Sequence, residues 1–318
     1  MELEDAVLSY VARSDLTVDT VAKLRHRLNC WNRHSARKTT EISAEEFDAF
    51  RLSARESGLS ARTIEETVND IAMISGLKEI GRRLKRWKTS ATKFVPALEL
   101  ISTAYENADS ADWPNCHLTR SPALRLVSSG VWLRAFIVFA FHTGLRLRDL
   151  RSITWDSITP DLIDWQASKT GKRHRIPNHP VVERHLEPLR AAGSDRVFPI
   201  SKSQERLLRR ELSQIAGDPE AFGPQPLRRA AVTQWALANW SAGEVVQGTA
   251  LSGVMSRYVD GLAVLVDALP RRAWPLAMLT PAERNERYSR EQSIIELAQR
   301  LPLERLDDLL KVGHAFAG

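Results

Sequence analysis

The sequence has 318 residues, of which 43% are hydrophobic and 26% are charged, a composition that excludes fibrous and disordered proteins. Its length suits two ordinary domains, and its 2 cysteines exclude a disulfide framework or a cysteine-rich zinc site. No apolar run reaches the roughly 18 residues that a membrane crossing needs, and the first residues lack a secretory signal pattern. We therefore expect a cytoplasmic protein with no membrane segment and no metal or other cofactor.

The first 77 residues are expected to form a helical domain. Ser43 and Glu46 have the spacing of a capping box, and the apolar residues after them recur at helical spacing until Gly58. Two further amphipathic segments, residues 21–31 and 60–76, flank this one. These apolar stripes are most simply the core of a small helical bundle.

A basic segment, residues 78–95, follows this domain. It holds seven basic residues and one acidic residue between positions 78 and 93, in a chain whose formal net charge is +6. Planar guanidinium groups bind phosphate oxygens two at a time, so we expect a linker that contacts a nucleic-acid backbone. The expected contacts are Arg82, Arg83, Lys85 and Arg86.

Residues 96–279 are expected to form a second domain, mainly α-helical with a small antiparallel β-sheet, so that the whole chain is of the α+β class. The apolar stretch 126–144 predicts a buried helix that ends at a glycine. Short segments of β-branched or alternating character predict the sheet; they are residues 153–158, 162–168 and 173–177. Further helices are expected at 96–108, 181–191, 201–216, 226–240 and 255–269.

A helical tail, residues 280–318, begins with a second capping box at Thr280 and Glu283. The tail carries balanced charge and a sizeable apolar surface. Two roles are open for it: docking on a neighbouring copy of the chain, or folding back on its own domain.

Residues 142–158, HTGLRLRDLRSITWDSI, resemble the first signature of the tyrosine recombinase (phage integrase) family. The resemblance implies that Arg146 reaches the scissile phosphate and that Asp149 supports it. Their spacing of three also places both on one helix face, where the carboxylate can hold the guanidinium.

Three later segments resemble the remaining signatures, in the order that the family uses. Lys169 lies in a hairpin turn, where Lys172 could replace it; Arg228 lies in PLRR, and Tyr258 lies in SRYV. The resemblance implies a helical core-binding domain that clamps double-stranded DNA, a catalytic domain, and a homo-oligomer, dimer or tetramer, on that DNA. Additional DNA contacts are expected from Lys172, Arg173, His174 and Arg229.

These residue types suit phosphodiester cleavage without a metal. Two arginines can neutralise the non-bridging oxygens of a five-coordinate phosphorus, and a lysine can protonate the departing 5′ oxygen. A tyrosine can attack and hold the 3′ phosphate covalently. The leading interpretation is a site-specific DNA recombinase that acts through a 3′-phosphotyrosyl intermediate. Tyr288 is a weaker candidate nucleophile, and Tyr10 and Tyr105 are expected to pack.

Two catalytic positions depart from the family pattern. Gln225 stands where the family usually has histidine, and Thr249 stands where it usually has histidine or tryptophan. Both side chains donate hydrogen bonds, but neither is an acid or base near neutral pH. They favour an alternative: a degenerate recombinase-like protein that binds DNA as a regulator or scaffold. A topoisomerase with the same chemistry is a third possibility.

Overall fold

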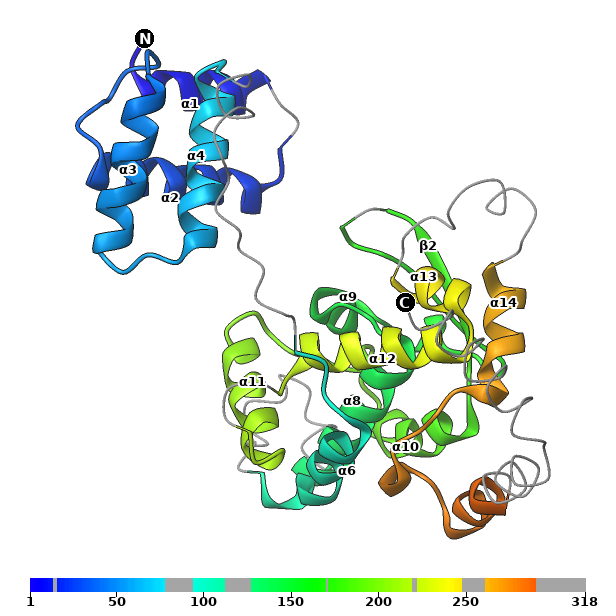
Figure 1. The fold of residues 1–318 in the computed structure, drawn as a ribbon. Helices are drawn as coiled ribbons and strands as arrows, with labels where there is room; N and C mark the ends of the chain where they lie inside the picture. The colour runs from blue at the N-terminus through cyan, green and yellow to red at the C-terminus, as the bar shows by residue number, and fades with distance from the viewer. Residues whose placement is uncertain are drawn as a thin grey trace, which may run out of the picture. The chain divides into compact units, whose positions relative to one another are not determined.

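The computed structural model describes residues 1–13, 16–77, 94–111, 127–169, 171–218, 222–247 and 261–289. The chain divides into two compact units (Figure 1), Met1–Lys93 and Phe94–Gly318. Each unit has its own hydrophobic core. Among the described residues, no helix is both long enough and apolar enough to span a bilayer.

The first unit is a helical bundle. Its helices are α1 (Leu3–Arg13), α2 (Val18–His34), α3 (Ala44–Glu56) and α4 (Ala61–Ile74). The predicted capping box is confirmed, because the Ser43 hydroxyl accepts from the Glu46 backbone and the Glu46 carboxylate accepts from the Ser43 backbone. The apolar stripes meet in one core, where the Trp31 and Phe50 ring centroids lie 4.8 Å apart.

The second unit is built around one buried helix. Its longer helices are α6 (Leu98–Glu106), α8 (Ser129–Thr143), α10 (Pro180–Ala191), α11 (Gln204–Ile215) and α12 (Pro224–Ala238). Shorter ones are α9 (Leu147–Ser152), α13 (Trp240–Gln247) and α14 (Gly261–Ala268), and residues 281–289 are helical. Helix α8 lies between α10 and α12 (Figure 1). Its Trp132, Phe136 and Phe139 surround Phe198 with ring centroids 5.4–5.6 Å apart, which explains the apolar run seen in the sequence.

Strands β1 (Leu162–Gln166) and β2 (Arg173–Pro177) form a two-stranded antiparallel sheet in which Trp165 is paired with His174. The third expected segment, residues 153–158, is not a strand. It forms the 3-10 turn Trp155–Ser157 with single bridges on either side. The Trp155 indole donates to the Ser194 carbonyl at 2.6 Å, so this segment is fixed to the end of α10.

The second expected capping box is also present. The Thr280 backbone donates to the Glu283 carboxylate at 2.7 Å, and the Glu283 backbone donates to the Thr280 hydroxyl at 3.3 Å. The expected helix over 255–269 is described from Gly261 onward. The basic segment up to residue 93 and the tail beyond residue 289 lie outside the described residues.

Candidate active site

The site begins at the turn between α8 and α9. Helix α8 ends at Gly144, whose φ of 59° is left-handed, a conformation that glycine adopts without strain. A Cβ on this glycine would lie 2.7 Å from a Val246 methyl carbon. The turn places Arg146, with extended backbone, immediately before α9. The glycine of the Thr-Gly-Leu-Arg motif is therefore required by both the backbone and the neighbouring α13.

Arg228 lies in the first half of α12 and bonds both the turn after α8 and the end of α13. One guanidinium nitrogen donates to the Gly144 carbonyl, and the other donates to the Gln247 carbonyl at 2.8 Å. Burial and the nearby Arg146 charge lower the pKa of Arg228 to about 10, against the opposing effect of Asp149. Arg228 is thus protonated at neutral pH and lies within electrostatic reach of Arg146, an arrangement that favours an anion between the two guanidinium groups.

Asp149 is buried, but its partner is not the predicted one. Its Oδ1 accepts from the Ser168 backbone at 2.9 Å and from the Ser168 hydroxyl at 2.6 Å. Arg146 makes no hydrogen bond or ion pair with the part of the chain that the structure describes. The expected direct contact is not made, because the Asp149 carboxylate is turned to the Ser168 donors of the hairpin instead.

The Asp149–Ser168 contact fixes the hairpin that carries the candidate lysines. Lys169 follows Ser168 directly and is exposed, as is Lys172. The turn between them is tight: the Gly171 backbone donates to the Ala167 carbonyl at 2.8 Å, with a φ of 65°. Both lysines are therefore presented to solvent from one short turn, and the choice between them stays open.

His174 lies within the electrostatic field of the arginine pair. Its ring stacks on Trp165, with centroids 5.2 Å apart and planes 14° from parallel. Burial, together with the charges of Arg146, Arg228 and Lys172, lowers its pKa, although the Asp149 carboxylate acts in the opposite sense. The ring is consequently an uncharged imidazole at neutral pH.

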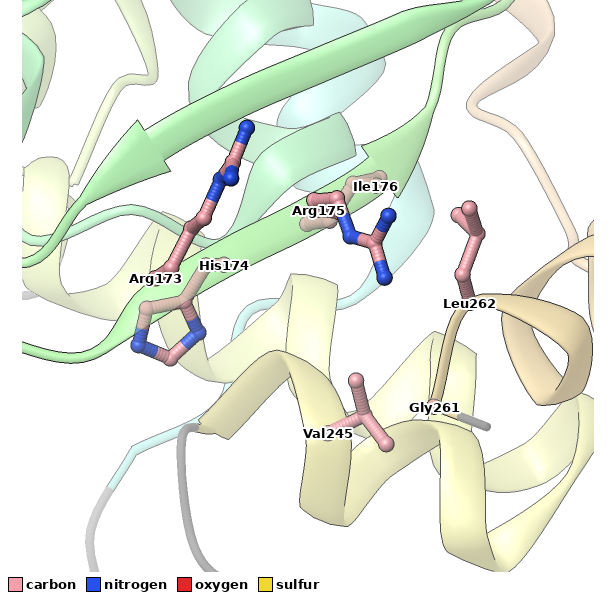
Figure 2. Close-up of a pocket in the computed structure, with 7 residues that line it drawn as sticks. All are labelled: Arg173, His174, Arg175, Ile176, Val245, Gly261 and Leu262. Carbon is pink, nitrogen blue, oxygen red and sulfur yellow. The ribbon is translucent and has the colours of Figure 1, made fainter. Parts of the chain in front are cut away.

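A hollow of about 180 Å³ lies beside His174, between β2 and the helices α13 and α14 (Figure 2). Val245 and Leu262 line it opposite the strand, and Gly261, the first residue of α14, lies at its edge. The hollow therefore adjoins the point where the described chain resumes after Gln247.

Solved structures with this arrangement of elements were found by comparison. A lambda integrase dimer bound to a COC′ core site matches 82% of this chain and 78% of its own, at 17% identity and a TM-score of 0.59. The Tn1549 transposon integrase (residues 82–397) in complex with circular intermediate DNA matches 86% of this chain and 100% of its own, at 13% identity and a TM-score of 0.60. The chain has the tyrosine recombinase fold. A lambda integrase tetramer bound to a Holliday junction matches 81% of this chain and 76% of its own, at 17% identity and a TM-score of 0.59. No family model and no curated protein matches the sequence.

Within this recombinase fold, the other predicted site residues have varied surroundings. Gln225 is exposed in the first turn of α12. Arg229 donates to the Phe94 carbonyl at 2.5 Å, and Arg173 forms an ion pair with Asp164 at 2.6 Å. The remaining predicted residues lie outside the described residues: Arg82, Arg83, Lys85, Arg86, Thr249 and Tyr258.

The competing tyrosines differ in exposure. The Tyr105 hydroxyl lies 2.6 Å from a His185 ring nitrogen, and the Tyr10 hydroxyl donates to the Met73 sulfur at 3.5 Å. Both contacts support the packing roles expected from the sequence. Tyr288 is 65% exposed in the helical residues 281–289. This exposure leaves it as a candidate for the rival nucleophile.

A buried arginine that sequence reasoning did not identify, Arg272, packs against the elements that carry the site. Arg272 is 4% exposed and lies over the rings of Phe141, Trp235 and Trp274, 4.5–4.9 Å from their centroids. It donates to His142 Nδ1 at 2.9 Å, so His142 Nε2 carries the proton that bonds the Pro177 carbonyl at 2.8 Å. This chain of contacts joins α8 to the end of β2. No local sequence pattern predicts it, because its members lie in four separate segments.

Proposed function

We propose that the protein is a tyrosine-type DNA strand transferase, a site-specific recombinase that cuts and rejoins DNA through a 3′-phosphotyrosyl intermediate. The observation that carries this proposal is the meeting of Arg146 and Arg228 at the Gly144 turn, beside the lysine hairpin that Asp149 fixes. The fold shared with DNA-bound integrases supports the same conclusion.

In this mechanism the two guanidinium groups bind the non-bridging oxygens of the scissile phosphate and stabilise the charge of the transition state. The Tyr258 oxygen forms a bond to phosphorus while the bond between phosphorus and the 5′ oxygen breaks. The phenol proton leaves to water, and Lys169 or Lys172 donates a proton to the departing 5′ oxygen. The covalent link preserves the energy of the phosphodiester, so a 5′ hydroxyl of another strand can reverse the step.

The assignment of Tyr258 is supported by the residues on either side of its segment. The described chain stops at Gln247, whose carbonyl accepts from Arg228. It resumes at Gly261, which lines the hollow beside His174. The two described residues that flank the segment 248–260 therefore lie beside Arg228 and His174, whereas Tyr288 belongs to the helix over 281–289.

The proposed partner is double-stranded DNA, bound by a homo-oligomer of the chain. Structural neighbours are a dimer on a core site and a tetramer on a Holliday junction. The proposed backbone contacts are the linker residues Arg82, Arg83, Lys85 and Arg86, and the hairpin residues Lys172 and Arg173. Arg173 and Arg229 are weaker candidates, because their guanidinium groups are already bonded to the Asp164 carboxylate and to the Phe94 carbonyl.

The second candidate function is a DNA-binding regulator or scaffold that does not cut. The specific observation in its favour is the pair Gln225 and Thr249, which leaves both usual imidazole positions without an acid or base. Arginine-based phosphate binding survives in this alternative.

One experiment separates the two functions. A duplex is first selected from a randomised pool for tight binding, and nicked versions of it that trap the covalent adduct are then incubated with the full chain. The recombinase proposal expects a denaturant-resistant protein–DNA adduct that Tyr258→Phe abolishes and Tyr288→Phe does not affect. Tight binding without any adduct supports the regulator instead, and an adduct lost only in Tyr288→Phe overturns the assignment of Tyr258.

A further inference from the structure

His174 faces the interior of the catalytic unit. Side chains alternate along a strand, so His174 is on the same face of β2 as Ile176, which packs with Trp235 of α12 and Val246 of α13. Figure 2 shows the His174 ring and the Arg173 side chain leaving the strand in opposite directions. The imidazole therefore points toward the helices that bring Arg228 and Gln247 together.

The ring is held in place, but its nitrogens bond to nothing in the described part of the chain. Stacking on Trp165 fixes the ring plane, and the side chain is half-buried. Neither ring nitrogen makes a hydrogen bond within the ranges that the structure describes. An oriented polar group that lies in the field of two arginines, with no hydrogen bond to any described residue, has the properties of a preorganised ligand group.

The charges around His174 come from three elements. The charges of Arg146 and Asp149 act on it from the start of α9, that of Arg228 from α12, and that of Lys172 from its own hairpin. Helices α13 and α14 present the apolar Val245 and Leu262 across the hollow. Three cations against one carboxylate leave an excess of positive charge that a phosphate would neutralise.

We propose that His174 is a third ligand of the scissile phosphate, donating an imidazole N–H to a non-bridging oxygen beside Arg146 and Arg228. This inference rests on the proposed function and deepens it. It provides from the sheet the imidazole that α12 lacks at Gln225 and that the chain lacks at Thr249. A neutral imidazole still carries one N–H, so the contact exists at neutral pH.

The first test measures the rate of adduct formation at saturating nicked duplex. His174→Phe preserves an aromatic ring over Trp165 but removes the donor, and it is expected to slow adduct formation about 100-fold with little change in DNA affinity. His174→Gln restores a donor and is expected to recover part of the rate. His185→Phe is the matched control, because His185 is a half-buried histidine that contacts Tyr105 instead, and its rate should match the wild type.

The second test does not depend on cleavage. Proton NMR follows the His174 ring in the Tyr258→Phe chain, free and bound to the selected duplex, with His174→Phe used for assignment. A phosphate contact is expected to raise the pKa of His174 on binding, because the anion offsets the arginine charges that lower it. An unchanged pKa, or an unchanged rate in His174→Phe when the wild type forms an adduct, overturns the inference alone. If the wild type forms no adduct, the proposed function fails, and the pKa still decides whether His174 binds phosphate.

Discussion

The carboxylate of Asp149 and both donors of Ser168 join helix α9 to the sheet hairpin, at 2.9 Å for the backbone nitrogen and 2.6 Å for the hydroxyl. Arg146 immediately precedes α9, three residues before Asp149, and Lys169 directly follows Ser168. This one contact therefore sets the distance between the arginine that is proposed to bind the phosphate and the lysine that is proposed to protonate the leaving oxygen.

Asp149→Ala should lower both stability and cleavage. The change leaves the Ser168 backbone donor without its partner, which costs about 1–3 kcal/mol in the free energy of unfolding, and it releases the hairpin, so adduct formation should slow. Urea unfolding and single-turnover adduct assays measure the two effects. Asp156→Ala removes an exposed carboxylate from the next turn and should change stability by less than about 0.5 kcal/mol. An equal effect of the two substitutions would contradict the role given to Asp149.

Replacing Arg146 or Arg228 by alanine should have different effects on the free energy of unfolding. Arg146 makes no hydrogen bond to the described chain, so Arg146→Ala should abolish adduct formation while the free energy of unfolding stays within about 0.5 kcal/mol of wild type. Arg228 donates to the Gly144 and Gln247 carbonyls, so Arg228→Ala should abolish the adduct and also destabilise by about 1–3 kcal/mol. The same urea and adduct assays apply, and an Arg146→Ala protein that still forms adduct at the wild-type rate would exclude Arg146 from the site.

Several of these relationships were open to sequence reasoning and others were not. The Gly144 turn, the two capping boxes and the hairpin follow from local chemistry, and the structure confirms them. The Asp149–Ser168 contact depends on how the hairpin folds back on α9, which no helix rule anticipates. The Arg272 cluster needs rings from α8, α12 and the loop after α14. Contacts between segments this far apart in the chain produce no periodic pattern in a single sequence, so they could not be predicted from it.

Gly144→Ala should destabilise the site in two ways, by a steric clash with Val246 and by backbone strain at a positive φ. The residue has a φ of 59°, and a Cβ would lie 2.7 Å from Val246. Gly217 has a φ of 70°, but a Cβ on it would meet nothing within 4 Å, so Gly217→Ala measures the strain alone, about 1 kcal/mol. We expect the larger loss in Gly144→Ala, by thermal and urea unfolding, and partial rescue by adding Val246→Ala. Equal losses at the two glycines would show that α13 does not constrain the turn.

The stability of the catalytic unit should fall as the pH drops below 6.5. Burial and the Arg272 charge lower the pKa of His179 to about 4 and hold that of His142 well below 6.5. The unfolded chain then binds more protons than the folded chain between these values, so the free energy of unfolding decreases as the pH falls from about 6.5 toward 4, by at most about 1.4 kcal/mol per pH unit for each histidine.

Urea unfolding across this pH range measures the slope. His179 Nδ1 also accepts the Val181 backbone at the start of α10, a contact that protonation removes. His179→Asn keeps a capping acceptor without the titration and should flatten the slope between pH 6.5 and 4. A slope identical to that of the wild type would show that His179 is not a source of the acid sensitivity.

Restoring histidine at positions 225 and 249 should speed adduct formation. Gln225 precedes Arg228 by one turn of α12 and is exposed, so an imidazole there lies on the same helix face as the guanidinium. One preorganised donor contributes on the order of 100- to 1,000-fold in rate, of which the neutral donors of Gln225 and Thr249 recover only part. Gln225→His with Thr249→His should therefore exceed the wild-type rate in the nicked-duplex assay, and Tyr258→Phe should abolish the adduct with little loss of binding. If neither the wild type nor the double-histidine chain forms an adduct, the site is not merely weakened, and the DNA-binding regulator becomes the better account.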